Sequence, residues 1–273
     1  MKNMLGKLKN VRGLTFLEIL IALTITGFVT TAVFRLYITQ HKNYMTQDDV
    51  TEIQQNARAS IDELSRNIRM AGFALPEGLK AIEAYDANPD TIVVNFFDQG
   101  CDTYLSAKMP QPSAELKCGT DISCFEDGQW VYIYDPDTQT GEWFEITHVQ
   151  PAAFHIQHNT MSLSKAYDEN AVILVITQVK YFIDETTEPD NPKLMIQRKG
   201  QEPQIFADNI IDLQFQYQMK NGLTVNAPIL ADDIRQVLIE LSGRSKSPDP
   251  DDLVNPYRLR TFNTAVNLRN LSS

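Results

Sequence analysis

The sequence predicts an α+β protein, in which a long N-terminal helix with a membrane-spanning first half packs on a β-rich, mainly antiparallel domain. Three observations lead to this prediction. An apolar run extends from Leu14 to Phe34, and apolar residues then recur at helical spacing as far as Met70. Short β-branched and aromatic runs, separated by turn residues, fill most of the sequence that follows.

The apolar run is long enough to cross a bilayer. It holds 21 residues, and Glu18 is the only charged one. At about 1.5 Å of rise per residue, such a helix is about 32 Å long, which matches a bilayer's hydrocarbon core. A basic leader precedes it, with no acid and with Lys2, Lys7, Lys9 and Arg12. This order predicts that the leader stays cytoplasmic while the C-terminal domain lies in the periplasm, anchored to the inner membrane.

The helical pattern continues beyond the apolar run. No glycine lies between Gly27 and Gly72, and no proline precedes Pro76. Apolar residues three and four apart form one face, at Val50, Ile53, Ala57, Ile61, Leu64 and Ile68. We therefore expect one helix from about Leu14 to about Met70. The chain then divides into a leader over 1–13, a membrane-spanning helix over 14–34, an amphipathic continuation over 35–72 and a β-rich domain over 73–273.

Nine segments of the β-rich domain are predicted as strands: Thr91–Phe97, Gln129–Tyr134, Glu142–His148, Ala153–His158, Ala171–Ile183, Lys193–Arg198, Asp212–Tyr217, Arg235–Leu241 and Tyr257–Leu268. Turn chemistry predicts a hairpin connection from Asp135 to Gly141 and a second turn at Asn221-Gly222. The segment from Phe206 to Leu213 is predicted as a turn or short helix that leads into a strand.

The charge excludes some classes of partner. The net charge is −11, and the basic leader holds four of the 24 Lys and Arg, so the rest of the chain is more acidic still. An acidic domain repels phosphate backbones, and we expect no nucleic-acid binding. The sequence also lacks the G-x-S-x-G, H-E-x-x-H and phosphate-loop motifs. We therefore expect no enzymatic activity, no catalytic residues and no cofactor.

Three cysteines, Cys101, Cys118 and Cys124, lie in the part predicted to be exported. An oxidising compartment favours one disulfide, and all three pairings remain open. No metal site is expected. His155 and His158 point to opposite faces of a strand, and the acidic runs lack the glycine and terminal glutamate of an EF-hand loop. These runs comprise Asp184, Glu185, Glu188 and Asp190, and Asp249, Asp251 and Asp252.

Glu18 is the residue with the most specific requirement. A carboxylate in an apolar span needs a partner, and no Lys or Arg lies within a turn of it. Cleavage after Gly13 would give Leu14 a new α-ammonium group. In staggered parallel helices, Glu18 of one subunit could then pair with the Leu14 amine of a neighbour. The alternatives are an ordinary membrane anchor with an incidental glutamate, or a cleaved secretory signal, although an A-x-A cleavage site is absent.

The stretch GLTFLEILIALTITG resembles the prepilin processing motif of type IV filament proteins, at Gly13, Leu14, Thr15, Glu18 and Gly27. The resemblance implies cleavage between Gly13 and Leu14 by prepilin peptidase, N-methylation of Leu14, and subunit docking through Glu18 beside Thr15. The sequence departs from the family twice. Leu14 replaces the usual Phe or Met, and Arg35 replaces a proline that kinks the helix in many major pilins, which predicts a straighter helix.

Other segments resemble the PilW-type minor pilin family. They are Ala57–Leu64, Asn67–Phe73, Ala207–Tyr217 and Arg260–Asn270. The middle of the chain, from about Pro76 to Pro203, resembles no known family. The resemblance implies a structural subunit that primes pilus assembly or lies near the tip. Its partners would be other minor and major pilins, prepilin peptidase, the inner-membrane assembly platform and the membrane.

Two alternatives remain at this point. A J-type pseudopilin of a type II secretion system shares the N-terminal motif. A membrane-tethered periplasmic enzyme or ligand-binding protein would keep Met1 instead of gaining a new N-terminus at Leu14. Within the pilin interpretation, Glu18 predicts that another subunit's amine lies above it, which disfavours the outermost position of the filament.

Overall fold

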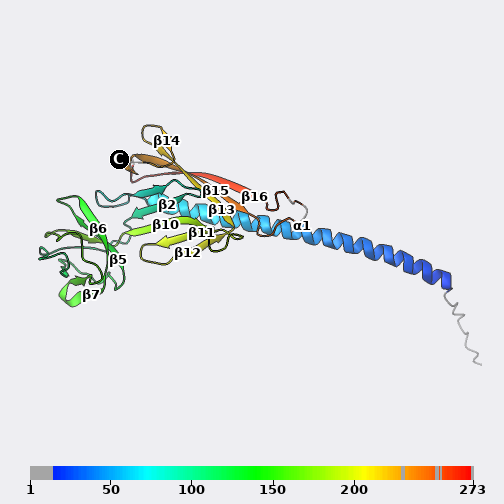
Figure 1. Ribbon diagram of the computed structural model, residues 1–273, viewed down its shortest axis with the longest axis horizontal. Coiled ribbons are helices and arrows are strands. Elements are labelled where there is room, and N and C mark those ends of the chain that lie inside the picture. Colours follow the sequence, from blue (N-terminus) through cyan, green and yellow to red (C-terminus); the bar gives the residue numbers. More distant parts are fainter. Residues whose placement is uncertain (1–14, 229–230, 250–251, 253, 272–273) are drawn as a thin grey trace, which may run out of the picture. The chain divides into compact units, whose positions relative to one another are not determined.

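The computed structural model describes residues 15–228, 231–249, 252 and 254–271. The chain divides into two compact units, Met1–Val50 and Thr51–Ser273. One α-helix, α1 (Phe16–Met70), supplies the described structure of the first unit and begins the second (Figure 1). The protein is α+β, as expected, because every strand pairing among the described residues of the second unit is antiparallel.

The first part of α1 is apolar and exposed. It is long and apolar enough to cross a membrane, and no residue of its most apolar stretch is buried. Several of its threonines satisfy their hydroxyl groups within the helix. The Thr26 hydroxyl donates to the Ala22 carbonyl at 2.7 Å, and that of Thr31 to the Gly27 carbonyl at 2.8 Å. Hydroxyl groups bonded in this way are tolerated in lipid.

The last part of α1 packs within the second unit. Ile53, Ala57, Leu64 and Ile68 are buried, which confirms the predicted apolar face. Polar contacts reinforce this packing. The Asn56 amide donates to the Asp208 carbonyl at 3.3 Å, and the Asn67 amide donates to the Tyr181 hydroxyl at 2.5 Å. The helix ends at Met70, as predicted, and Gly72 follows in a left-handed conformation (φ 79°).

Two antiparallel sheets share a hydrophobic core with this part of α1 (Figure 1). The first has the strand order β1-β2-β10-β11-β12 and the second has the order β14-β13-β15-β16. The strands of the first are β1 (Ile82–Tyr85), β2 (Thr91–Phe96), β10 (Thr177–Asp184), β11 (Lys193–Arg198) and β12 (Gln204–Asp208). Those of the second are β13 (Ile210–Met219), β14 (Thr224–Val225), β15 (Ile234–Arg244) and β16 (Leu259–Asn267), and a 3₁₀-helix over Ala231–Asp233 precedes β15.

Residues 97–176, here called the insert, form a second body of strands between β2 and β10. Those two strands are neighbours, with Phe96 paired to Thr177, so the chain leaves and re-enters the first sheet at the same place. The insert has its own core. Its sheets have the orders β3-β9-β5-β6 and β4-β8-β7. The strands are β3 (Asp102–Tyr104), β4 (Leu116–Lys117), β5 (Trp130–Asp135), β6 (Thr140–Glu145), β7 (His148–Gln150), β8 (His155–Gln157) and β9 (Val172–Leu174), and a 3₁₀-helix spans Pro151–Ala153.

Three predicted segments differ from the structure. The segment Ala171–Ile183 forms two strands, because β9 pairs with β5 in the insert whereas β10 pairs with β2. The segment Glu142–His148 is divided between β6 and β7. No helix forms between Phe206 and Leu213, since β12 runs directly to β13 through Asn209 in a left-handed turn (φ 58°). For β9, β10 and β13 the pairing partners are distant in sequence, and the local pattern carries no information about them. The division of Glu142–His148 instead reflects two separate hairpins, because β6 pairs with β5 and β7 pairs with β8.

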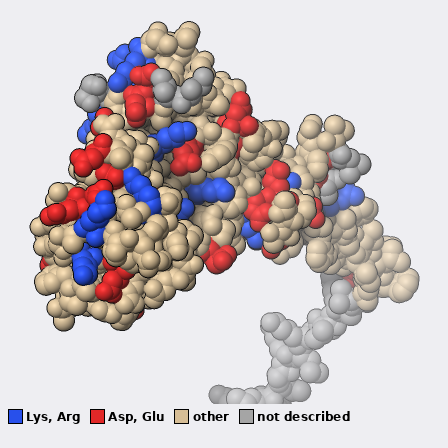
Figure 2. All heavy atoms as spheres, turned by 60° about the vertical axis from the view of Figure 1, so that its left-hand side comes forward, with Lys and Arg blue, Asp and Glu red and all other residues tan. Residues whose placement is uncertain are grey.

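The charge is unevenly distributed along the chain. The insert holds twelve Asp and Glu but only three Lys and no Arg, a net −9 of the total −11. On the face shown in Figure 2, acidic and basic side chains are interspersed rather than gathered in one patch. The acidity is therefore a property of the insert's composition, and the visible face presents no single charged surface.

Candidate assembly site

The N-terminus of α1 is capped by the two residues that the sequence places in the docking motif. The Thr15 backbone N–H and hydroxyl both donate to Glu18 Oε2, at 2.8 and 3.0 Å. In return, the Glu18 N–H donates to the Thr15 hydroxyl oxygen at 3.3 Å. This reciprocal arrangement is a capping box. It supplies Glu18 with hydrogen bonds inside its own chain, and Oε1 has no hydrogen-bond partner among the described residues.

Sequence reasoning missed this cap, although the signal was readable. Threonine followed three residues later by glutamate, before an apolar run, is the capping-box pattern. The predicted cleavage site, Gly13 and Leu14, lies outside the described residues. Processing, methylation and the docking role of Glu18 and Thr15 therefore stay predictions.

A shallow groove of about 620 Å³ runs along α1 from Glu18 to Phe34. Several side chains along its middle are small, because Ala22, Thr26 and Thr30 follow each other at intervals of four beside Gly27, although the larger Leu23 also lines it. Small residues at this spacing allow two helix backbones to approach closely in a membrane. The groove therefore has the surface that a second apolar helix requires.

Gly27 has no role in the packing of its own chain. A Cβ atom built at Gly27 meets nothing within 4 Å. Glycine inside a helix costs roughly 0.5–1 kcal/mol relative to alanine. No contact within the described chain therefore requires a glycine at this position.

The structure selects one of the three cysteine pairings. Cys101 and Cys124 form a disulfide, and Cys118 is a free, buried thiol. Burial raises the pKa of the Cys118 thiol to about 11, although a hydrogen bond with Thr103 acts in the opposite direction. A thiol of this kind is nearly all protonated at neutral pH and is a poor nucleophile or metal ligand.

The histidines of the insert take part in packing. His155 lies 3.2 Å from Glu115, while His158 is buried, with its two ring nitrogens 2.9 Å from the Met161 carbonyl and 2.8 Å from the Ala114 carbonyl. Among the described residues, no three His, Cys, Asp or Glu side chains gather in a way that could hold a metal ion. The acidic residue Asp184 instead accepts hydrogen bonds from the turn that follows it.

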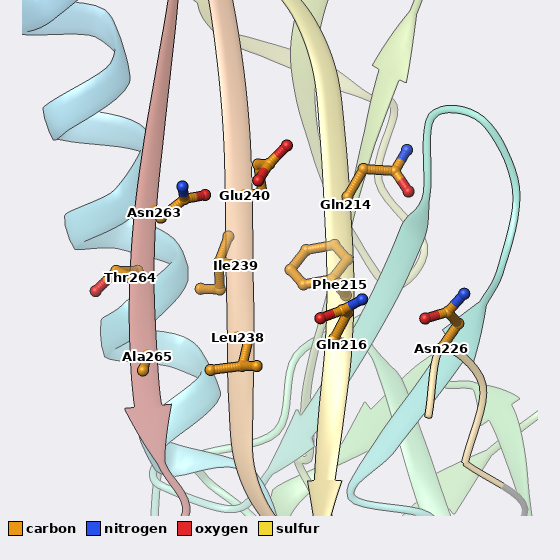
Figure 3. Close-up of a pocket in the computed structure, with 10 residues that line it drawn as sticks. All are labelled: Gln214, Phe215, Gln216, Asn226, Leu238, Ile239, Glu240, Asn263, Thr264 and Ala265. Carbon is orange, nitrogen blue, oxygen red and sulfur yellow. The ribbon is translucent and has the colours of Figure 1, made fainter. Parts of the chain in front are cut away.

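The outer face of the second sheet has a further groove, of about 660 Å³. Figure 3 shows its lining residues on three adjacent strands, β13, β15 and β16, together with Asn226 after β14. The polar residues are amides and one carboxylate, Gln214, Gln216, Asn226, Asn263 and Glu240, around the apolar Leu238. The lining also includes the hydroxyl group of Thr264 and the small apolar side chain of Ala265.

Comparisons of the chain with protein-family models, with curated proteins and with solved structures found no match.

Proposed function

We propose that this chain is a minor pilin, a structural subunit of a type IV pilus whose N-terminal helix docks against the helices of neighbouring subunits. The observation that carries the proposal is the exposed groove from Glu18 to Phe34, in which small side chains lie beside one carboxylate. An apolar helix with such a face is complete only when other helices cover it.

The capping box supports a docking role for Glu18. Both hydrogen bonds from Thr15 reach Oε2, so Oε1 keeps its capacity to accept from a cation of another subunit. The proposed cation is the α-ammonium group created at Leu14 by cleavage after Gly13. Thr15 would thus hold the carboxylate in place while the neighbouring chain neutralises it.

The separate core of the second unit supports the rest of the proposal. The apolar face of α1 after Thr51 is buried in that core, so the domain needs no contribution from the apolar part of the helix. The Cys101–Cys124 disulfide agrees with a domain exported to an oxidising compartment. In this proposal the helix enters the filament and the domain, including the insert, faces the surroundings.

The test compares two carboxylates of α1. Glu18→Ala should prevent the full-length protein from co-purifying with other pilus subunits, whereas Glu52→Ala, at an exposed position of the second half, should not. Both variants should reach the membrane in normal amounts. Unchanged complex formation and unchanged piliation with Glu18→Ala would remove the docking role.

A further inference from the structure

A small crevice lies where the insert meets the turn between β11 and β12. Its volume is about 170 Å³. The turn and the end of β11 contribute Arg198, Lys199 and Gln201, and the insert contributes Gln99, Gln129 and Trp130. Both sides belong to the same compact unit. Gln178 of β10 also lines it, so the lining combines two cationic residues, four glutamines and one tryptophan.

The two cations have no carboxylate to balance them. No Asp or Glu lines the crevice, and neither Arg198 nor Lys199 forms an ion pair within the part of the chain that the structure describes. Burial lowers the pKa of the Lys199 ammonium, and a more distant Glu83 only partly offsets this. In a chain with a net charge of −11, two adjacent unpaired cations indicate a place that accepts an anion.

The crevice is held in shape by close packing. The Lys199 ammonium lies 5.1 Å from the centre of the Trp130 ring and 5.2 Å from that of Trp143, within the range of cation–π attraction. Gly200 follows with φ 74°, and a Cβ atom there would overlap the Trp130 ring. Only glycine therefore fits between the turn and the indole.

The amides add hydrogen-bond donors to the charges. The side-chain oxygen of Gln129 accepts from the Glu126 N–H at 3.1 Å, which leaves its NH₂ group to donate elsewhere. By contrast, the Gln178 amide, at the edge of the crevice, is already engaged with Asn95 at 2.9 Å. The lining thus brings together an arginine, a lysine and at least one uncommitted amide.

We propose that this crevice binds the carboxylate of a small organic acid. Arg198 and Lys199 would neutralise the carboxylate, whose two oxygens match the fork of a guanidinium group. The Trp130 indole would contact the apolar part of the molecule. The volume corresponds to about five or six water molecules at about 30 Å³ each, which fits an acid of a few carbon atoms. The site would act independently of filament assembly, since it uses no residue of α1.

The fluorescence of the protein's own tryptophans can report binding at the crevice. It has only two tryptophans, Trp130 and Trp143, and both lie against Lys199. Butyrate titrated into the full-length protein in detergent micelles, at constant ionic strength, should change the tryptophan emission in a saturable way. Inorganic phosphate and butanol serve as a charged probe without an apolar body and as an apolar probe without a charge.

Arg198→Gln and Lys199→Gln should each weaken butyrate binding at least about tenfold, as expected when a charge-assisted hydrogen bond is lost. Ligand-detected NMR measures the same affinity without relying on the tryptophans, whose emission Lys199→Gln itself alters. The matched control is Lys180→Gln. The Lys180 ammonium lies 4.8 Å from the Phe182 ring but does not line the crevice, so affinity should stay unchanged.

Three results would overturn the proposal. One is a response that never saturates or that sodium chloride reproduces. Another is equal weakening by Lys180→Gln. A third is binding of phosphate or butanol as tight as that of butyrate, which would contradict the assignment to carboxylates. Equal thermal unfolding of wild type and variants shows that a lost affinity is not a lost fold.

Discussion

The two parts of α1 have the same backbone conformation but opposite relations to the rest of the chain. From Phe16 to Met45 the large apolar side chains are exposed, as with Leu23 at 70%, whereas after Thr51 one face is buried, as with Leu64 at 0%. Hydrophobic burial stabilises the second part within its own molecule. The first part has no such contacts among the described residues, and it is long and apolar enough to cross a membrane.

The largest predicted effect is a difference in stability between the same substitution made in each of the two parts of α1. Leu64→Ala should lower the free energy of unfolding of the domain by about 2–5 kcal/mol, because it leaves a cavity in a closed core. Leu23→Ala, with the same change of side chain, should leave that free energy unchanged. Chemical denaturation of both variants, followed by tryptophan fluorescence, measures the difference. If Leu23→Ala destabilised the domain as much as Leu64→Ala, the proposed division of α1 into two parts would be contradicted.

The disulfide should stabilise the insert. It closes a loop with a sequence separation of 23, and replacing Cys101 and Cys124 together by serine should lower the free energy of unfolding by about 3 kcal/mol.

Cys118 gives a contrasting prediction. Its thiol should not react with alkylating reagents in the folded protein at pH 8, because burial raises its pKa to about 11. Mass spectrometry after alkylation, with and without denaturant, counts the modified cysteines. Modification of Cys118 in the native state would contradict its burial.

Gly27→Leu should break assembly without harming the domain. A leucine at Gly27 has space within its own chain, since nothing lies within 4 Å, but it fills the groove that a neighbouring helix would enter. Recovery of the protein with other pilus subunits should fall several-fold, and the thermal unfolding of the domain should stay the same. Ala32→Leu, outside the groove, is the matched control and should assemble normally. Similar behaviour of the two variants would show that the groove has no special role.

The smallest effect concerns acid stability. The hydrogen bond from Lys165 Nζ to Asp135, at 2.6 Å, lowers the pKa of that carboxyl group from 3.8 to about 2. Because the pKa is lower in the folded state, the contribution to stability is present above about pH 4 and is lost as the pH falls towards 2. Asp135→Asn should therefore make the free energy of unfolding depend less on pH between about pH 4 and pH 2. Asp137→Asn, in the same turn, should leave the acid profile as in the wild type.

Local sequence patterns were sufficient to predict the elements whose structure depends on residues close to one another in sequence. The length of α1, its end at Met70, its buried face and the strand Lys193–Arg198 were all predictable from local periodicity. The insert was not, because only the distant pairing of Phe96 with Thr177 reveals that the chain leaves and re-enters one sheet. Strands of only two residues, such as β4 and β14, are too short for any pattern to emerge.

The sites follow the same rule. The partnership of Thr15 and Glu18 was encoded within four residues and could have been read. The pairing of Cys101 with Cys124 and the crevice around Lys199 could not, since both depend on where the insert folds back on the chain. Local chemistry can be predicted from neighbours in sequence, whereas sites built by long-range contacts require the fold.

The most direct test of the central claim is the intact mass of the protein recovered from assembled filaments. Docking of the apolar half of α1 through Glu18 requires a free amine at Leu14, so the mature chain should lack the first thirteen residues. The mass should correspond to a chain that begins at Leu14, with one added methyl group. Recovery of fully functional protein that still begins at Met1 would contradict the account.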